Sequence, residues 1–388
     1  MPRKNEVPAP NAAFAGAASP FFVTPADRIA WARERYFEEG QRPSGLVSEP
    51  VIQSWQRCLA AGLKPHQRPD FEPVTRWRAN AALARSELLL DAAAPELDQL
   101  DTLIAGTHCR VVLTDGQGIV LRATASPAGG HGVLDIGTRV GVDLAEANLG
   151  STAPSVSSAS GQACTVSGGE HFFGVLEQVH CAAAPIRNRE GALAAVLDLS
   201  IEGQPFAFDA FSVVRLFAAA IENRLAAAQA AEHLLLHFQL APAMLGTPLE
   251  GVAVVDGRGQ VGWVNGAGRA LLEHPRAPQG MHDVESLFGI TLEALLRLAG
   301  AVAPQPHRLP SGLGVWLTVD PPGRATRPAA DAGSLLDVNR RHIEHTLASC
   351  SGNLSAAARK LGVSRGLLYR RLREWRDADE ASAPLPAT

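Results

Sequence analysis

The chain has 388 residues, of which 46% are hydrophobic, and a formal net charge of −4. This length and hydrophobic content suffice for two or three domains with apolar cores. No stretch approaches the roughly 20 apolar residues that span a bilayer, and the N-terminus lacks the apolar region of a signal peptide, so we expect a cytoplasmic protein without membrane contact. The 5 cysteines form no CxxC pair, which fits reduced thiols in that compartment.

The first quarter of the chain is predicted to be an irregular terminus followed by helices. Residues 1–24 are rich in Pro and Ala and are expected to be disordered. A helical segment is expected over 25–99. Apolar residues recur there at helical spacing, which predicts helices over 27–39, 50–62 and about 75–103.

Residues 100–226 are expected to form one sheet framed by helices. Short apolar runs between turn residues predict strands at 111–115, 119–123, 163–167, 181–187 and 192–200. This order of elements is typical of a small-molecule sensor domain and not of a doubly wound nucleotide fold.

A long helix is predicted from 209 to about 240, so that residues 227–245 form a connecting helix. Val213, Phe217, Ile221 and Leu225 lie near one face of it. That face is a candidate dimer seam, and an ordinary packing helix explains the same pattern.

A second, smaller unit is expected over 246–320. The run from Gly251 to Asn265 places two apolar strands around a glycine turn and is similar to the opening of a PAS domain. The stretch that follows is short for that fold, so a degenerate PAS domain and a dimerisation spacer remain alternatives. The Gly-x-Gly-x-x-Gly pattern at 257–262 predicts a hairpin and not a dinucleotide site, because strand residues follow its third glycine. Residues 321–333 are expected to be a linker.

Residues 334–376 are predicted to form three helices, the last two joined by a tight turn, before a tail at 377–388. Asn353 or Ser355 can cap the second helix, and Gly362 can end it. Ser364 can cap the third helix, which has one apolar stripe. Three helices with such a turn form a helix-turn-helix unit, whose last helix enters the major groove of DNA.

The charge of this segment supports the same prediction. Residues 334–376 contain six more basic than acidic side chains, whereas the whole chain carries −4. Such asymmetry indicates a nucleic-acid-binding module attached to an acidic body. Together the elements predict an α+β multidomain protein.

The C-terminal segment resembles the DNA-binding domain of the nucleoid protein Fis and of bacterial enhancer-binding activators. The matching residues are Gly352-Asn353, Ala356-Ala357, Leu361-Gly362-Val363, Ser364-Arg365-Gly366 and Leu368-Tyr369-Arg370-Arg371-Leu372. The resemblance implies double-stranded operator DNA as the partner. It implies that the groove is contacted by Ser364, Arg365, Leu367, Tyr369 and Arg370. It implies that Lys360, Arg371 and Arg373 lie nearer the phosphates.

Between about residues 45 and 226 the chain resembles regulators of the acetoin-catabolism type, in the family's order and spacing. The matching motifs include Ser54-Trp55, Leu149-Gly150-Ser151-Thr152-Ala153, Gly169-Glu170-His171-Phe172 and Cys181-Ala182-Ala183-Ala184-Pro185-Ile186. The resemblance implies a GAF sensor domain at 100–226 that binds a small-molecule effector. The family's Gly-Thr-Asn-Ala here reads Gly-Ser-Thr-Ala, which leaves the identity of the effector open. The candidate effector-binding residues are Thr152, Glu170, His171, Phe172, His180 and Cys181.

The full-length activators of that family use an AAA+ ATPase to remodel sigma-54 polymerase. A P-loop needs Gly-Lys-Ser/Thr, and the lysines at 4, 64 and 360 lack that context. We therefore expect a regulator that works without ATP hydrolysis, catalyses no reaction and needs no cofactor or metal. It is expected to be a homodimer that reads two half-sites, with RNA polymerase as a further partner.

Three other functions remain open at the level of the sequence. A metal or redox sensor could use His108-Cys109, Cys164, His171 and His180-Cys181, although their spacing is irregular. A GAF-type reductase would act on methionine sulfoxide through a cysteine of low pKa. A Fis-like architectural protein would bend DNA without an effector.

Overall fold

The computed structural model describes residues 24–124, 132–272, 282–301, 303–323 and 354. The disordered terminus predicted at 1–24 lies outside these residues except for Thr24. Most of the linker, the tail and the predicted helix-turn-helix unit, apart from Leu354, also lie outside them. The described part folds around two antiparallel sheets, which are named here the first and the second sheet.

Four helices precede the first sheet, where the sequence predicted three. They are α1 (Pro25–Phe37), α2 (Glu49–Ala60), α3 (Arg76–Arg85) and α4 (Glu87–Ile104). The capping box of Thr24 and Asp27 starts α1, because each side chain satisfies a backbone N–H of the other residue. The single helix predicted at about 75–103 is divided in two at Ser86, which ends α3 and precedes α4.

The first sheet contains the five strands that the sequence predicted. They are β1 (Arg110–Asp115), β2 (Val120–Ala123), β3 (Cys164–Ser167), β4 (Val179–Arg187) and β5 (Leu193–Glu202), in the order β2-β1-β5-β4-β3. The segment between β2 and β3 forms α5 (Val133–Gly137), α6 (Glu146–Leu149) and α7 (Ala153–Ser160). The short turns η1 (Gly168–Glu170) and η2 (Gly174–Leu176) connect β3 to β4.

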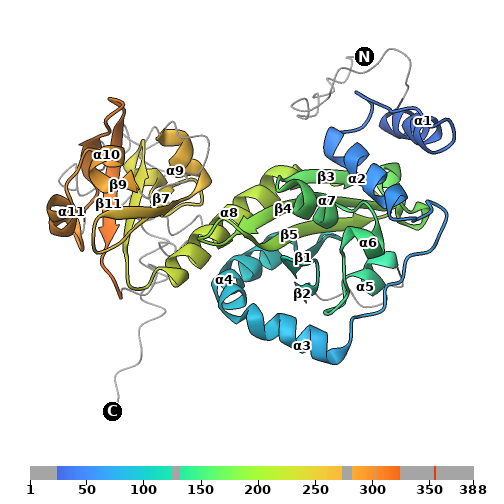
Figure 1. Ribbon diagram of the computed structural model, residues 1–388, viewed down its shortest axis with the longest axis horizontal. Helices are drawn as coiled ribbons and strands as arrows, with labels where there is room; N and C mark the ends of the chain where they lie inside the picture. Colours follow the sequence, from blue (N-terminus) through green and yellow to red (C-terminus); the bar gives the residue numbers. More distant parts are fainter. Residues whose placement is uncertain (1–23, 125–131, 273–281, 302, 324–353, 355–388) are drawn as a thin grey trace. The chain divides into compact units, whose positions relative to one another are not determined.

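The two faces of the first sheet have different partners (Figure 1). On β5, Leu197 and Leu199 pack against α4 and α8 (Ala210–Gln229). Val196 lies on the opposite face, in a cluster that includes Trp55 of α2 and Val156 of α7. This follows from the period of two in a strand, which sends successive side chains to opposite faces. The helices of residues 25–99 thus share both cores with the sheet.

The apolar face of α8 that was a candidate dimer seam packs against other elements of the same chain. Phe217, Ile221 and Leu225 are buried in the core between α8, α4 and the first sheet. The alternative of a packing helix therefore accounts for this stripe.

The prediction of a connecting helix over 227–245 is wrong. Helix α8 ends at Gln229, and residues 234–239 form strand β6 (Leu234–Gln239). A short apolar run of this kind fits a buried strand as well as a helix, so periodicity alone could not separate them. Strand β6 pairs with β7 along one edge and β11 along the other, and its alternate side chains are buried in two separate apolar clusters.

Among the described residues between 234 and 320, six strands form the second sheet. They are β6, β7 (Gly251–Val255), β8 (Gln260–Val264), β9 (His282–Asp283), β10 (Gln305–Arg308) and β11 (Gly314–Asp320), in the order β10-β11-β6-β7-β8-β9. Three short helices and a single turn complete the unit: α9 (Gly266–Leu271), α10 (Val284–Phe288), α11 (Leu292–Leu298) and η3 (Pro242–Met244). Its buried apolar side chains form a core, so the segment is folded, and both the degenerate PAS domain and the dimerisation spacer stay predictions. The Gly-x-Gly-x-x-Gly segment is the predicted hairpin between β7 and β8.

A charged cluster in the second sheet consists of His237 on β6, Glu250 just before β7 and Asp320 at the end of β11. His237 of β6 lies with Nδ1 3.1 Å from Glu250 and Nε2 3.5 Å from Asp320 at the end of β11. Burial alone would lower the pKa of His237, but its two carboxylate partners outweigh that effect and raise the pKa to about 9. The imidazole is therefore protonated at neutral pH.

The stability of this unit is expected to fall as the pH rises. The folded pKa of about 9 exceeds the ordinary value of 6.5, so the stabilisation is complete below about pH 6.5 and is lost as the pH passes 9. We expect a loss of about 2–3 kcal/mol in the free energy of unfolding. Urea denaturation of the full chain and of the His237→Gln variant, each at pH 6 and 9.5, measures how much the free energy of unfolding falls between the two pH values. Equal pH dependence in both proteins would contradict this account.

In the part of the chain that the structure describes, no helix has the length and apolar character needed to cross a membrane.

Candidate functional site

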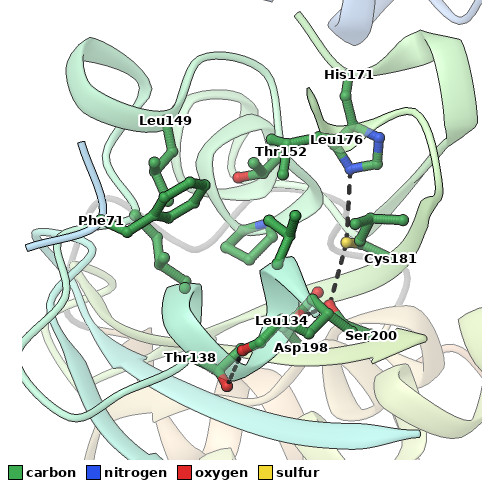
Figure 2. Close-up of a pocket in the computed structure, with 15 residues that line it drawn as sticks. Phe71, Leu134, Thr138, Leu149, Thr152, His171, Leu176, Cys181, Asp198 and Ser200 are labelled. Carbon is green, nitrogen blue, oxygen red and sulfur yellow. Dashed lines mark hydrogen bonds between the residues drawn. The ribbon is translucent and has the colours of Figure 1, made fainter. Parts of the chain in front are cut away.

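A pocket with an enclosed volume of about 40 Å³ lies on the face of the first sheet opposite α4 and α8. Figure 2 shows the residues that line it. Its apolar wall comes from loops and short helices as well as strands. The apolar lining residues are Phe71, Val133, Leu134, Gly137, Leu144, Leu149, Pro154, Leu176 and Val179. The polar and thiol lining residues are Thr138, Thr152, His171, Cys181, Asp198 and Ser200.

The strands bring the polar side chains of the pocket together. Asp198 and Ser200 are two residues apart on β5, so both point to the face away from α4 and α8. Cys181 on β4 is the cross-strand partner of Ser200. Three groups from two neighbouring strands therefore form one patch on the floor of the pocket.

These groups form a hydrogen-bonded chain (Figure 2). Ser200 Oγ lies 2.5 Å from Asp198 Oδ2 and 3.1 Å from Cys181 Sγ, and Cys181 Sγ lies 3.6 Å from His171 Nε2. His171 Nδ1 lies 2.9 Å from the carbonyl oxygen of Gly168. Since that carbonyl can only accept, Nδ1 carries the proton and Nε2 accepts.

Burial favours the uncharged forms of the three titratable groups in this hydrogen-bonded network, Asp198, His171 and Cys181. It raises the pKa of Asp198 to about 7, against the opposing effect of the hydrogen bond from Ser200. It lowers the pKa of His171 to about 4 and raises that of the Cys181 thiol well above its ordinary value. At neutral pH the imidazole and the thiol are therefore uncharged, and Asp198 is close to half ionised.

The N-terminal helices hold the two loops that carry pocket residues. Arg33 of α1 donates to the carbonyl oxygens of Gly169, His171 and Phe172 at 2.8, 2.5 and 3.2 Å. Trp55 Nε1 of α2 donates to the carbonyl oxygen of Glu170 at 2.8 Å. The loop that presents His171 is thus fixed from outside the sheet.

The second loop is held by α2. Arg57 makes a two-point contact with Glu146 of α6, with N···O distances of 2.6 and 2.8 Å. Ser54 also donates to Glu146 and lies 2.6 Å from Ser151 Oγ. Both contacts flank the α6–α7 connection, which places Leu149 and Thr152 in the pocket wall.

The structure brings together three of the six candidate effector-binding residues. Thr152, His171 and Cys181 line the pocket. Glu170 instead folds back to accept from the backbone N–H of Ser167, and Phe172 is fully buried in the aromatic cluster around Trp55. His180 does not line the pocket, because it alternates with Cys181 along β4.

Sequence reasoning missed Asp198 and Ser200, the floor of the pocket. The available signal was an acid within the apolar run Val196-Leu197-Asp198-Leu199-Ser200. An acidic side chain in a strand that is otherwise buried needs a partner or a function.

The residues proposed for metal or thiol chemistry are not arranged for it. Cys109 packs in the core against α4 and α8, whereas Cys164 and Cys181 lie on the other face of the sheet. Among the described residues, no group of three or more His, Cys, Asp or Glu side chains is placed to hold a metal ion. Burial raises the pKa of Cys58 to about 11 and of Cys164 to about 12, the opposite of a reactive thiol.

All predicted DNA-contacting residues, from Lys360 to Arg373, lie outside the described residues.

Two protein families match the chain. The model of the MimR N-terminal domain matches residues 24–221, which include the four N-terminal helices and the whole first sheet. The model of the Fis family of bacterial regulatory proteins matches residues 334–375. The Fis match confirms the resemblance expected for the C-terminal segment.

Curated relatives are transcriptional regulators. The acetoin catabolism regulatory protein of Cupriavidus necator is 28% identical over 261 residues, which cover 64% of this chain and 39% of the relative. The propane 2-monooxygenase operon activator MimR of Mycolicibacterium smegmatis is 28% identical over 196 residues, covering 50% and 32%. The chain thus spans about two-fifths or less of the length of these relatives. Among solved structures, the Escherichia coli DhaR(N)–DhaL complex is similar, with a TM-score of 0.44, 16% identity and coverage of 70% and 99%.

Proposed function

Because the chain belongs to the family of the MimR N-terminal domain and carries a Fis-type segment, we propose that it is a DNA-binding transcriptional regulator whose first sheet binds a small-molecule effector. The observation that carries this proposal is the pocket on the first sheet. It combines an apolar wall with a few convergent polar groups, which is the usual composition of a small-molecule site.

The output of the proposed regulator is the segment 334–376. Its groove contacts are Ser364, Arg365, Leu367, Tyr369 and Arg370, with Lys360, Arg371 and Arg373 near the phosphates. Because a single helix-turn-helix unit binds weakly, we propose a homodimer that reads two half-sites about one helical turn apart. The lysines of the sequence lack a P-loop context, so the proposed regulation proceeds without ATP hydrolysis.

The proposed signal passes through β4 and β5. Their pocket-facing residues alternate with residues that pack on α8, so a ligand that shifts these strands also shifts the helix packed behind them. The effector would act by favouring one of two arrangements of the DNA-binding segments. In this proposal RNA polymerase is recruited or blocked at the bound operator.

Replacement of Arg365 by alanine is expected to weaken specific operator binding by about 1–3 kcal/mol, because it removes a base contact in the groove. Quantitative filter binding to the selected operator and to random DNA measures the effect. Arg297→Ala is the control, since Arg297 is an exposed residue of α11 that pairs with Glu293. An unchanged ratio of specific to random binding in Arg365→Ala would refute the groove assignment.

A further inference from the structure

One polar atom of the pocket is left without a partner. Asp198 is 2% exposed, and its Oδ1 has no hydrogen-bond partner in the described structure, whereas Oδ2 accepts from Ser200. A buried carboxylate oxygen without a partner costs free energy. A ligand that donates a hydrogen bond to Oδ1 would remove that cost.

The other polar side chains of the pocket are already engaged. Thr138 donates to the carbonyl oxygen of Leu134 and accepts from Arg110, and Thr152 caps α7 through the backbone N–H of Ser155. His171, Cys181 and Ser200 belong to the hydrogen-bonded chain described above. Asp198 Oδ1 is therefore the polar atom that remains for a ligand among the described lining residues.

The charges around the pocket disfavour an anionic ligand. Among the described lining residues none is Lys or Arg. Arg110, which contacts Thr138, is paired with Asp135. A carboxylate ligand would lose its hydration and meet Asp198 without a counter-charge, which is strongly unfavourable.

We propose that Asp198 determines the specificity of the effector site, by accepting a hydrogen bond at Oδ1 from a hydroxyl group of a small uncharged ligand and by excluding carboxylates. This inference rests on the proposed effector function of the same pocket. The ligand's hydrocarbon part lies against Phe71, Leu134, Leu149 and Leu176. The enclosed volume of about 40 Å³, room for roughly three water molecules, restricts the ligand to a few carbon atoms.

A series of four-carbon probes tests the proposal in the full chain at pH 8, where Asp198 is mostly ionised. The probes are 2-butanol, 2-butanone and butanoate, and calorimetric titration gives their affinities. We expect 2-butanol to bind at least tenfold more tightly than 2-butanone, and butanoate not to bind. Equal affinity for the alcohol and the ketone, binding of butanoate, or no binding of 2-butanol would overturn the proposal.

Two variants separate recognition from structure. Asp198→Asn keeps the shape of the side chain and adds an N–H donor, so the alcohol-to-ketone preference is expected to fall to about one while the melting temperature is kept or rises. Ser157→Ala is the matched control, because Ser157 Oγ is also buried and unpartnered but lies outside the pocket lining. If Asp198→Asn keeps the preference for 2-butanol over 2-butanone, or if Ser157→Ala loses it, the proposed role of Asp198 is wrong.

Operator binding, measured in the same samples, distinguishes this inference from the proposed function. Alcohol binding that depends on Asp198 but leaves operator affinity unchanged supports the specificity role and contradicts effector sensing. A ligand without a hydroxyl group that binds the pocket and alters operator affinity supports sensing and overturns the role of Asp198.

Discussion

Replacement of Gly150 by alanine is expected to lower the free energy of unfolding by about 3–5 kcal/mol, the largest effect among the substitutions considered. Gly150 has φ 61° and ψ −149°, a conformation that is essentially restricted to glycine and costs about 1–3 kcal/mol for other residues. A Cβ atom there would lie 2.8 Å from Cβ of Phe172 and 3.2 Å from the ring of Phe173. Overpacking against these buried rings adds about 1–3 kcal/mol.

Urea denaturation of the full chain measures this effect, and Gly191→Ala is the control. Gly191 also has a positive φ, of 78°, but no atom lies within 4 Å of the position of its Cβ. Gly191→Ala is therefore expected to lower the free energy of unfolding by only about 1–2 kcal/mol, through backbone strain. A similar fall in the free energy of unfolding in the two variants would show that the contacts with Phe172 and Phe173 do not add to the destabilisation.

Replacement of Arg33 by methionine is expected to destabilise the chain by about 3–4 kcal/mol and to weaken ligand binding in the pocket. Methionine keeps much of the side-chain packing but removes the donors to the carbonyl oxygens of Gly169, His171 and Phe172. Each partly buried carbonyl group left without a partner costs about 1–3 kcal/mol, although the sites are not additive. The guanidinium also loses its contacts over the rings of Phe37 and Trp55.

Arg35→Met is the matched control on the same helix. Arg35 pairs with Glu39 at 3.7 Å near the surface, where an ion pair contributes about 0–1 kcal/mol. Chemical denaturation and titration with a pocket ligand are to be made on both variants. If Arg33→Met behaves like Arg35→Met, α1 does not support the loop that carries His171.

The elements that the sequence predicted well are those with two independent signals. The strands of the first sheet combine apolar runs with turn residues, such as the glycines at 116 and 118, and all five were found. Strand β6 was mistaken for helix because Leu234, Leu235 and Leu236 have no period of their own and no turn signal follows α8. Its identity depends on the pairing with β7 and β11, which only the folded chain provides.

Three of the six candidate effector-binding residues line the pocket. The other three do not, because the fold decides where each side chain points. Thr152, His171 and Cys181 belong to motifs that the family resemblance marked, and they line the pocket. Glu170 and Phe172 belong to the same motif as His171, but the turn η1 directs them to a backbone N–H and to the aromatic core. Asp198 was not among the candidate residues, although residues 196–200 belong to the segment that resembles the family, because its role depends on which face of β5 is turned to the pocket.

The contacts of α1 with the loop before β4 have a consequence for synthesis of the chain. Arg33 and the carbonyl group of His171 are 138 residues apart in sequence. At 5–20 residues per second, α1 leaves the ribosome roughly 7 to 28 s before its partner loop exists. During that interval Ile29 and Ala32, which are buried in the folded protein, lack the surface that covers them. Until β3 and β4 have been made, this apolar face of α1 in the nascent chain is therefore exposed to water.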